Sequence, residues 1–360
     1  MEQRHAYLGF NLTAGIGPSR VARLVDYFGT ALAAWAAPAS ELSACGLGAK
    51  SVSALLAARE RYDLDAEFTR AAQLGVSIIC IEDAAYPALL HQIPQPPPLL
   101  YLRGEISKAD DWALAVVGTR GPSEYGREAT RRIAGELAGA GVTIISGLAL
   151  GIDAAAHTAA LDAQGRTLAV LACGVDLPYP ERNRRLADQI VQNGALISEY
   201  PLSSVPLPNN FPARNRLISG LARGTLVVEA GERSGALITV EFALEQGREV
   251  FAVPGPIYSP KSVGTHRLIR DGATLVTCAQ DMLDGMNWTM VSAQQEVRQA
   301  IPETADEAVL LPLVGYEPRH VDELGRSCGL ATPTLLSTLA MLELKGVVRQ
   351  AGPMQYVLAR

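Results

Sequence analysis

The chain of 360 residues has few cysteines, and none of the five stands at Cys-x-x-Cys spacing. This excludes a zinc site built on such pairs, and an odd number of scattered cysteines suits a reducing compartment better than a disulfide framework. No apolar run reaches about 18 residues, and the start of the chain, Met1 to His5, does not resemble a signal peptide. We therefore expect a cytoplasmic protein without a membrane-spanning segment.

The sequence also lacks the common motifs of nucleotide chemistry. It has no Gly-x4-Gly-Lys-Ser/Thr loop and no intact Gly-x-Gly-x-x-Gly followed by an acidic residue. Asp153 and His157 are four residues apart and could form an acid–base or metal-binding pair, but the sequence places no third ligand or nucleophile near them. The simpler interpretation is that Asp153 is an N-cap or first-turn residue of a helix and that His157 is its hydrogen-bonded partner. We predict a protein that is not an enzyme and holds neither a metal nor a cofactor.

The net charge of −6 argues against nucleic-acid binding when the chain is taken as a whole. The distribution of charge changes this conclusion, because residues 181–223 carry six arginines and three acidic residues, a local charge of +3. Arginine matches the geometry of a phosphate group, and a local basic region makes a salt-dependent contribution to binding. The sequence therefore allows a phosphate-bearing ligand at this segment.

From Trp112 onwards, short apolar segments alternate with helical patterns. This alternation is typical of a parallel sheet that is covered by helices on both faces. We predict an α/β protein with an extended Rossmann-like, doubly wound and mostly parallel sheet. Ligands of such sheets bind beyond the carboxyl ends of the strands, where the strand order reverses. The expected strands are 113–117, 143–146, 167–172, 195–198, 225–229, 249–253 and 274–276.

The regions before and after this sheet predict smaller units. Gly15-Ile16-Gly17 returns as Gly46-Leu47-Gly48, a pattern of helix–hairpin–helix turns, although a packing module with glycine-capped helices is an alternative. The helix expected over 332–345 lacks the basic residues of a DNA-reading helix, so we expect its unit to bind protein or to pack. The predicted domains are a helical SAM/helix–hairpin–helix-like domain over 1–72, a Rossmann-like domain over 73–285, a linker over 286–303 and a winged-helix-like domain over 304–360.

Three segments that should meet at the carboxyl edge of the sheet suit a strand of nucleic acid. Residues 209–220 combine one phenylalanine with two arginines and three asparagines. The loops 117–121 and 146–153 each leave an apolar strand and enter a helix, where N–H groups and the helix dipole favour an anion. Arginines hold phosphates and an aromatic ring stacks on a base, so the combination favours single-stranded nucleic acid.

Two further loops are candidates for the same site. Pro178 and Pro180 predict a rigid loop around Tyr179, which either lines the site or packs against its neighbours. Ser234-Gly235 lies between a strand and a helix, where it either binds a phosphate or allows close packing. The sequence leaves both alternatives open.

Several motifs together resemble the DprA (Smf) family of DNA-processing proteins, and the resemblance covers nearly the whole chain. It implies a recombination mediator that binds and protects incoming single-stranded DNA and loads the RecA recombinase during natural transformation. It also implies a homodimer formed through the Rossmann-like domain. The motifs are Val117-Gly118-Thr119-Arg120, the stretch from Ser146 to His157, Leu177-Pro178-Tyr179-Pro180 with Asn183, Ser198-Glu199-Tyr200-Pro201, Phe211-Pro212-x-Arg214-Asn215-Arg216-x-Ile218-x-Gly220 and Val253-Pro254-Gly255.

The resemblance assigns the pocket arginine to Arg120 and the aromatic and basic block to residues 211–216. Two positions depart from the family pattern. Residues 206–210 lack the basic residue that family members often place before the phenylalanine. Glu181 stands where a cationic residue would help to bind DNA, so Arg182 or Arg184 would have to supply that contact. The predicted DNA contacts are Gly118, Thr119, Arg120, Ser146, Gly147, Asn183, Phe211, Arg214, Asn215, Arg216, Ser234 and Gly235.

The predicted dimer contact is a short helix near the edge of the sheet, with Leu268 and Ile269 as adjacent apolar residues among charges. The main alternative to a DNA-binding protein is a nucleotide-processing enzyme similar to the lysine-decarboxylase-like phosphoribohydrolases. Glu241 is a candidate remnant of their paired glutamate, but their Pro-Gly-Gly-x-Gly-Thr block is absent. A DNA-binding regulator that uses the winged helix is a third possibility.

Overall fold

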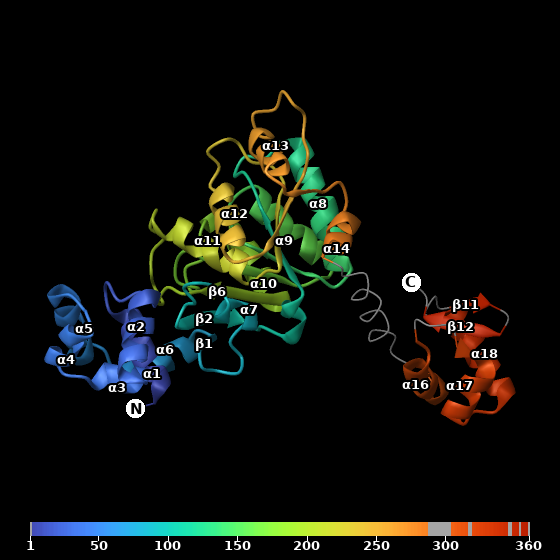
Figure 1. Cartoon of the computed structure of the whole chain (residues 1–360), viewed down its shortest axis with the longest axis horizontal. Helices are drawn as coiled ribbons and strands as arrows, with labels where there is room; N and C mark the ends of the chain where they lie inside the picture. Colours follow the sequence, from blue (N-terminus) through green and yellow to red (C-terminus); the bar gives the residue numbers. More distant parts are fainter. Residues whose placement is uncertain (1, 287–303, 316–318, 345–347, 353, 359–360) are drawn as a thin grey trace. The chain divides into compact units, whose positions relative to one another are not determined.

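The computed structural model describes residues 2–286, 304–315, 319–344, 348–352 and 354–358. The chain divides into two compact units, Met1–Met282 and Leu283–Arg360, and each is described by itself (Figure 1). Of the predicted linker 286–303, all but Met286 lies outside the described residues. In the part of the chain that the structure describes, no helix is both long and apolar enough to cross a membrane.

The first unit begins with six helices, and their turns follow the repeat seen in the sequence. Gly15, with φ of +81°, precedes α2, and Gly46, with φ of +91°, precedes α5. Glycine adopts such positive φ values without strain, which explains the two Gly-x-Gly motifs. The expected boundary at residue 72 stays a prediction, because helices and sheet belong to one compact unit. The helices are α1 (Gln3–Leu12), α2 (Pro18–Phe28), α3 (Ala31–Ala36), α4 (Ala39–Ala44), α5 (Ala49–Arg61) and α6 (Leu64–Gln73).

The rest of this unit is the predicted alternation of strands and helices. Strands β5 and β7 end two residues before the predicted ends, where the chain turns into loops at the carboxyl edge. The strands are β1 (Val76–Cys80), β2 (Leu99–Gly104), β3 (Ala113–Val117), β4 (Thr143–Ser146), β5 (Thr167–Val170), β6 (Gly194–Ser198), β7 (Gly224–Val227), β8 (Glu249–Ala252) and β9 (Thr274–Leu275). The helices are α7 (Ala88–His91), η1 (Lys108–Asp111), α8 (Glu124–Gly139), α9 (Ile152–Asp162), η2 (Glu181–Asn183), α10 (Arg184–Asn193), α11 (Asn210–Gly220), α12 (Ala236–Glu245), α13 (Val263–Arg270) and α14 (Ala279–Gly285).

These strands form one nine-stranded sheet in the order β1-β2-β6-β5-β4-β3-β7-β8-β9. The strands from β6 to β9 are parallel, while β1 and β2 join the sheet in antiparallel pairs. After β3 the chain builds the sheet in one direction as far as β6, and it then returns to place β7 on the other side of β3. The strand order therefore reverses beside β3, which is where a ligand site is expected in such a sheet.

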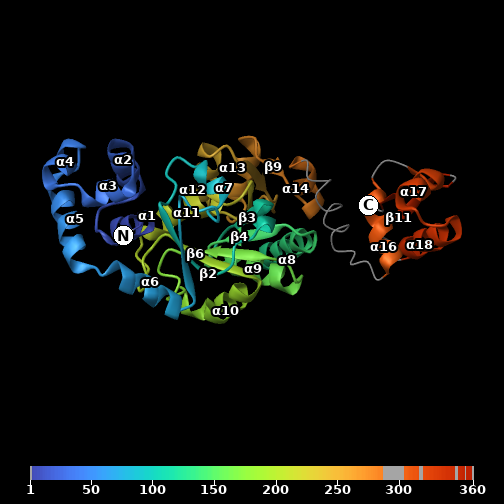
Figure 2. The same cartoon turned by 90° about the horizontal axis from the view of Figure 1, so that it is seen from below.

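Helices cover both faces of the sheet, as the continuous burial of β3, β4 and β5 requires. Helices α8, α9 and α10 pack together as one layer, and α11 packs with α7 and α12 in the other layer (Figure 2). The second layer meets the strands in an apolar cluster that includes Leu217, Ile218 and Val240. The predicted doubly wound, mostly parallel fold is confirmed.

The second unit contains two helices followed by a hairpin, which fits the predicted winged-helix-like domain. An apolar core that includes Leu324, Leu335 and Leu339 joins its helices to its strands. The short strand β10 pairs with β12, and β12 pairs with β11, so the three strands form an antiparallel sheet typical of a winged helix. The elements are α16 (Ala305–Leu310), η3 (Leu311–Leu313), β10 (Arg319–His320), α17 (Val321–Cys328), α18 (Thr332–Leu344), β11 (Val348–Gly352) and β12 (Gln355–Leu358).

Candidate functional site

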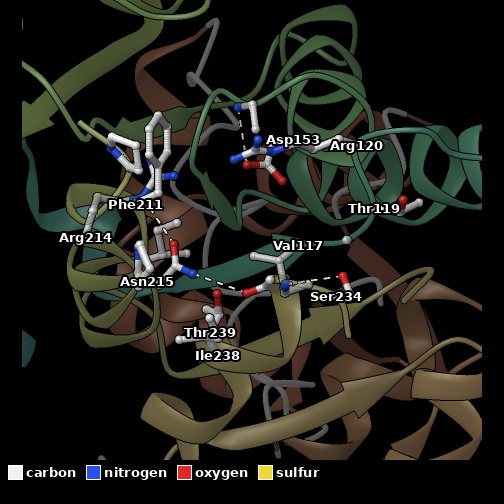
Figure 3. A pocket seen from close by; sticks show the side chains of 17 residues that line it. Val117, Thr119, Arg120, Asp153, Phe211, Arg214, Asn215, Ser234, Ile238 and Thr239 are labelled. Atoms are coloured by element: carbon white, nitrogen blue, oxygen red, sulfur yellow. Dashed lines mark hydrogen bonds between the residues drawn. The ribbon is translucent and has the colours of Figure 1, made fainter. Parts of the chain in front are cut away.

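A cavity of about 630 Å³ opens at the carboxyl ends of the central strands, where the strand order reverses. We call it the edge pocket. Its walls come from the loop after β3, the loop between β4 and α9, the start of α11 and the start of α12 (Figure 3). The lining residues are Val117, Gly118, Thr119, Arg120, Ala149, Asp153, Pro208, Phe211, Pro212, Arg214, Asn215, Ile218, Ser234, Gly235, Ala236, Ile238 and Thr239.

An aromatic ring and a solvent-exposed cation meet at this pocket. Phe211, in the first turn of α11, is half-buried, and Arg120 is exposed. The Arg120 guanidinium carbon lies over the Phe211 ring, 5.4 Å from its centroid. At this distance the cation and the π system attract one another. Among the described residues no carboxylate pairs with Arg120 within 4.0 Å, so the guanidinium N–H groups can bind an anion.

Arg214, one helical turn after Phe211 on α11, has a different environment from Arg120. Its side chain is only 4% exposed, and its Nη1 group donates to the carbonyl oxygens of Gly147, at 2.9 Å, and Val170. The side chain thereby joins α11 to the ends of β4 and β5. Arg214 forms part of the pocket wall, but its donors on Nη1 are already used by the protein.

A buried carboxylate also lies next to Gly147. Asp153 Oδ2 accepts the backbone N–H groups of Gly147 and Ala149, at 3.2 and 3.3 Å. A Cβ atom at Gly147 would lie 2.7 Å from Arg214 Nη2 and 2.8 Å from Asp153 Oδ2, so only glycine fits between the two charged groups. Burial raises the pKa of Asp153 and the nearby Arg214 opposes this rise. Burial likewise lowers the pKa of Arg214.

The interpretation of Asp153 and His157 as hydrogen-bonded partners is wrong. His157 is fully buried, and its Nδ1 atom lies 2.6 Å from Thr167 Oγ1 on β5. Burial and then the charge of Arg214 lower the pKa of His157 to about 3, so the imidazole is neutral at physiological pH. Asp153 binds N–H groups of its own loop instead, which is a common role for an acidic residue at a helix start.

Close backbone packing fixes the loop that carries Arg120. Gly151 has φ of +91°, and a Cβ atom there would lie 2.4 Å from the carbonyl oxygen of Thr119. The backbone N–H of Ile152 donates to the same oxygen at 3.2 Å. The loop after β3 and the loop after β4 therefore hold one another in place, which limits the positions that Arg120 can reach.

The structure brings eight of the twelve predicted contact residues together around the edge pocket. They come from three separate segments: Gly118, Thr119 and Arg120 after β3; Phe211, Arg214 and Asn215 on α11; Ser234 and Gly235 before α12. Asn215 Nδ2 donates to the carbonyl oxygen of Gly235 at 3.4 Å, so α11 and the start of α12 are also joined directly.

Three other predicted contact residues are buried and do not line the edge pocket. Ser146 is fully buried, and its hydroxyl donates to the carbonyl oxygen of Val116 at 2.6 Å. Gly147 lies behind the pocket wall, and its N–H is bonded to Asp153, so the protein's own carboxylate takes the place of the expected anion. Asn183 is buried, and its Nδ2 atom donates to the carbonyl oxygen of Leu148 at 2.8 Å.

Arg216 does not line the edge pocket either, so the structure does not place it with the other predicted DNA contacts. It lies on the other side of α11, in a second cavity of about 880 Å³ next to the helices of the N-terminal region. Arg216 Nη2 forms a buried ion pair with Glu199. Burial raises the pKa of Glu199, and Arg216 opposes this rise. The arginine therefore joins α11 to the end of β6.

Nine residues that line the pocket are not among the predicted contacts: Val117, Ala149, Asp153, Pro208, Pro212, Ile218, Ala236, Ile238 and Thr239. Ile238 and Thr239 stand three and four residues after Gly235, at the start of α12, and helical spacing places them on the pocket side. That spacing was available from the sequence. The apolar wall they form complements the aromatic ring of Phe211.

Comparisons with known sequences agree with this arrangement. Residues 77–287 match the sequence model of a family described as DNA recombination-mediator protein A, and residues 294–352 match the DprA winged helix domain. Protein Smf of Escherichia coli strain K12 is 40% identical over 346 residues, which cover 91% of this chain and 91% of that protein. DNA processing protein DprA of Streptococcus pneumoniae strain R6 is 44% identical over 219 residues, which cover 61% of this chain and 77% of that protein.

Solved structures show the same likeness. The X-ray structure of DNA processing protein A from Streptococcus pneumoniae aligns with a TM-score of 0.69 at 36% identity, and covers 78% of this chain and 97% of that chain. A structure of DNA processing protein A from Helicobacter pylori, described in terms of that protein's single-stranded DNA binding mode, aligns with a TM-score of 0.54 at 30% identity. It covers 59% of this chain and 96% of that chain. The sequence matches and the fold lead to one conclusion: the chain belongs to the DNA recombination-mediator protein A family, DprA/Smf.

Proposed function

We propose that this protein binds single-stranded DNA in the edge pocket. The observation that carries the proposal is the pairing of an exposed cation with an aromatic ring, Arg120 and Phe211, in a cavity of about 630 Å³. A cation that holds the phosphate backbone and an aromatic platform that stacks on bases are the two elements of sequence-tolerant single-strand binding. The family relative from Helicobacter pylori, whose structure concerns single-stranded DNA binding, supports the same function.

The geometry suggests how a nucleotide would fit. Phe211 and the half-buried side chain of Ile238 offer surface to a base, while Arg120 can reach a phosphate. Because the Arg120 guanidinium lies over the Phe211 ring, a base that stacks on Phe211 either displaces the guanidinium or stacks on its outer face. A duplex hides its base faces, so we expect a preference for single strands.

We propose that the protein binds DNA without changing it chemically. Asp153 is the acidic residue of the pocket lining, and its Oδ2 atom is bonded to two backbone N–H groups, which makes it a poor general base. Glu241, the residue suggested for a nucleotide-processing enzyme, is exposed on α12 and does not belong to the pocket lining. These positions favour a binding protein over that alternative.

A binding assay tests the proposed function directly. We expect oligo-dT to bind more tightly than duplex DNA of the same length, with an affinity that falls as salt rises. Free nucleotides added to the reaction should be recovered unchanged. Equal affinity for duplex and single strand would contradict the proposal, and release of a base or phosphate from nucleotides would support the enzyme alternative.

Arg120→Ala is expected to weaken oligo-dT binding by about tenfold or more, since a charge-assisted arginine contact contributes roughly 1–3 kcal/mol. Arg131→Ala is the matched control, because Arg131 is an exposed arginine of α8 that pairs with Glu128. Both affinities are measured by fluorescence anisotropy at one salt concentration. A folded Arg120→Ala protein with wild-type affinity would remove Arg120 from the DNA site.

We further propose that the bound strand is protected and passed to the RecA recombinase during natural transformation. Family membership supports this role, because the matched family is that of recombination mediators. Two measurements test it: the nuclease resistance of oligo-dT with the protein bound, and the rate at which RecA assembles on that complex. If the protein slows RecA assembly at every concentration, the loading role is wrong.

We also propose a homodimer formed through the region around α13. Ile257, Tyr258 and Val263, just before and at the start of this helix, expose large apolar side chains, and so does Leu275 on the edge strand β9. Apolar residues gathered at a sheet edge are typical of an interaction surface. Leu268 is half-buried and packs against the core, while Ile269 is half-buried without belonging to that cluster. Ile269 is therefore the cleaner position to test.

Ile269→Glu is expected to shift the protein to monomers. In an isologous interface one substitution acts twice, and each buried unpaired carboxylate costs at least about 1 kcal/mol, so the dimer should weaken by about 30-fold or more. Sedimentation over a concentration series measures the change. Leu244→Glu, at an exposed apolar position of α12, is the control. A wild-type protein that stays monomeric throughout the series would rule out the dimer.

A further inference from the structure

A second aromatic ring lies beside the edge pocket without lining it. Tyr179, in the loop between β5 and α10, has 49% of its surface exposed, and Leu177 in the same loop is exposed as well. The Tyr179 ring contacts the Phe211 ring edge to face, with 6.0 Å between the centroids and 65° between the planes. Tyr179 therefore extends the aromatic surface from the pocket towards α10.

The loop that carries Tyr179 is held firmly. Asn183, at its end, is buried and donates to the carbonyl oxygen of Leu148, so the loop is attached to the loop after β4. At the other end, the Leu177 backbone N–H donates to the carbonyl oxygen of Gly174 at 3.0 Å. Pro178 and Pro180 restrict the backbone on both sides of the tyrosine. A ring that is already fixed loses little conformational freedom when a ligand stacks on it.

The two rings differ in how open their faces are. Arg120 and Arg214 lie over the Phe211 ring at 5.4 and 6.0 Å from its centroid. Within the part of the chain that the structure describes, no arginine or lysine lies over the Tyr179 ring. Because the rings already touch, a base cannot enter between them without separating them. The open face of Tyr179 is thus a second stacking surface.

Two exposed arginines follow Tyr179 in the chain, one in η2 and one in the first turn of α10. Arg182 and Arg185 are exposed, and among the described residues neither pairs with a carboxylate within 4.0 Å. Arg184 is different, since its Nη1 atom lies 3.1 Å from Glu181 Oε1. Two unpaired arginines three and six residues after an exposed aromatic ring match the phosphates and the base of a nucleotide strand. A purely apolar protein partner would leave both cations without a counterpart.

We propose that a single strand which leaves the edge pocket continues over Tyr179, with a base stacked on its open face and phosphates near Arg182 and Arg185. This inference rests on the proposed function and adds a direction to it. The strand runs from the loop after β3 across the ends of β4 and β5 towards α10. The pocket and this surface, which we call the tyrosine platform, form one continuous site.

The length dependence of binding tests the tyrosine platform. Affinity is measured for oligo-dT in steps from about 4 to 16 nucleotides, the range of site sizes for single-strand binding folds. In Tyr179→Ala the gain in affinity between the shortest and the longest oligomer should fall by at least about fivefold, the loss expected for one stacked base. Tyr179→Phe should keep the gain, because it keeps the ring. Tyr27→Ala, which removes a ring of the N-terminal helices that is 57% exposed, is the control.

The phosphate contacts of Arg182 and Arg185 are tested separately, through the salt dependence of binding. The double substitution Arg182→Ala with Arg185→Ala should reduce the slope of log K against log salt by about 1.4 for the longest oligomer, since two phosphate contacts to a single strand are lost. A second probe is 2-aminopurine placed along the longest oligomer. Its fluorescence should be quenched at one position beyond the pocket in the wild type and recover in Tyr179→Ala.

The outcomes separate this inference from the proposed function. If the affinity of Tyr179→Ala still rises with oligomer length as in the wild type, or falls by the same factor at every length, the tyrosine platform is wrong. The edge pocket would not be affected by either result. If the wild-type protein binds no oligomer of any length, both are wrong. If Tyr179→Ala keeps DNA affinity but loses protein-stimulated RecA assembly, the surface contacts a protein, which also overturns the strand path.

Discussion

Arg214→Met is expected to lower the free energy of unfolding of the unit Met1–Met282 by about 3–5 kcal/mol, because two buried carbonyl groups lose their donor and a nearby buried carboxylate loses its counter-charge. The guanidinium is 4% exposed and donates to the carbonyl oxygens of Gly147 and Val170. Methionine fills similar space but donates nothing. Both carbonyl groups and the buried carboxylate of Asp153 would then lose a favourable neighbour.

Denaturant unfolding, followed through the fluorescence of Trp35 and Trp112, measures this loss. Arg120→Met makes the same chemical change at an exposed position and should shift stability by no more than about 0.5 kcal/mol. Adding Asp153→Asn to Arg214→Met should cost less than the two single changes together, because the carboxylate no longer lacks its counter-charge. Strict additivity would show that the two charges do not interact.

Arg120 and Arg214 show what the sequence could and could not reveal about the site. Both are arginines of segments expected at the carboxyl edge of the sheet, and both were predicted to contact DNA. In the structure Arg120 is exposed and Arg214 is buried against two carbonyl groups. Burial of this kind depends on how β4, β5 and α11 meet, which local sequence does not encode. The pattern predicted the location of the pocket but not the division of roles within it.

The misplacement of Arg216 has a different origin. Arg214 and Arg216 stand two residues apart on α11, and at 3.6 residues per turn their side chains point about 200° apart. One of them lines the edge pocket and the other pairs with Glu199 on the far side of the helix. The alternation of strands and helices in the sequence also predicts a helix over residues 211–222, so its periodicity already excluded a common role for the two arginines.

The fold was more predictable than the site, for physical reasons. Apolar strands such as β3, β4 and β5 are buried on both faces, and a chain can achieve this only with helices on each side of a parallel sheet. Side-chain networks obey no such periodicity. Ser146 and Asn183 stand in family motifs, yet their side chains bond to backbone carbonyls of Val116 and Leu148. A motif residue can be required for the position of a loop rather than for ligand contact.

Acidification is expected to destabilise the unit Met1–Met282 through His157. Burial lowers the pKa of this histidine from 6.5 to about 3 in the folded protein. The unfolded chain therefore binds a proton at pH values where the folded protein does not, and stability falls as the pH drops below 6.5. The contribution is about 1.4 kcal/mol per pH unit, or about 2–3 kcal/mol by about pH 4.5.

The difference between the wild type and His157→Gln isolates this contribution. Burial raises the pKa of Asp153 and of Glu199, so these carboxyl groups act with the opposite sign and partly offset the slope in the wild type. Subtracting the two stability curves cancels the carboxyl groups that the substitution leaves unchanged. Hydrogen exchange of the β4 and β5 amides reports on the layer in which Thr167 contacts the imidazole. Parallel curves for the two proteins between pH 6.5 and about 4.5 would mean that His157 takes up its proton in the folded state without cost, and that the burial seen here does not govern its titration.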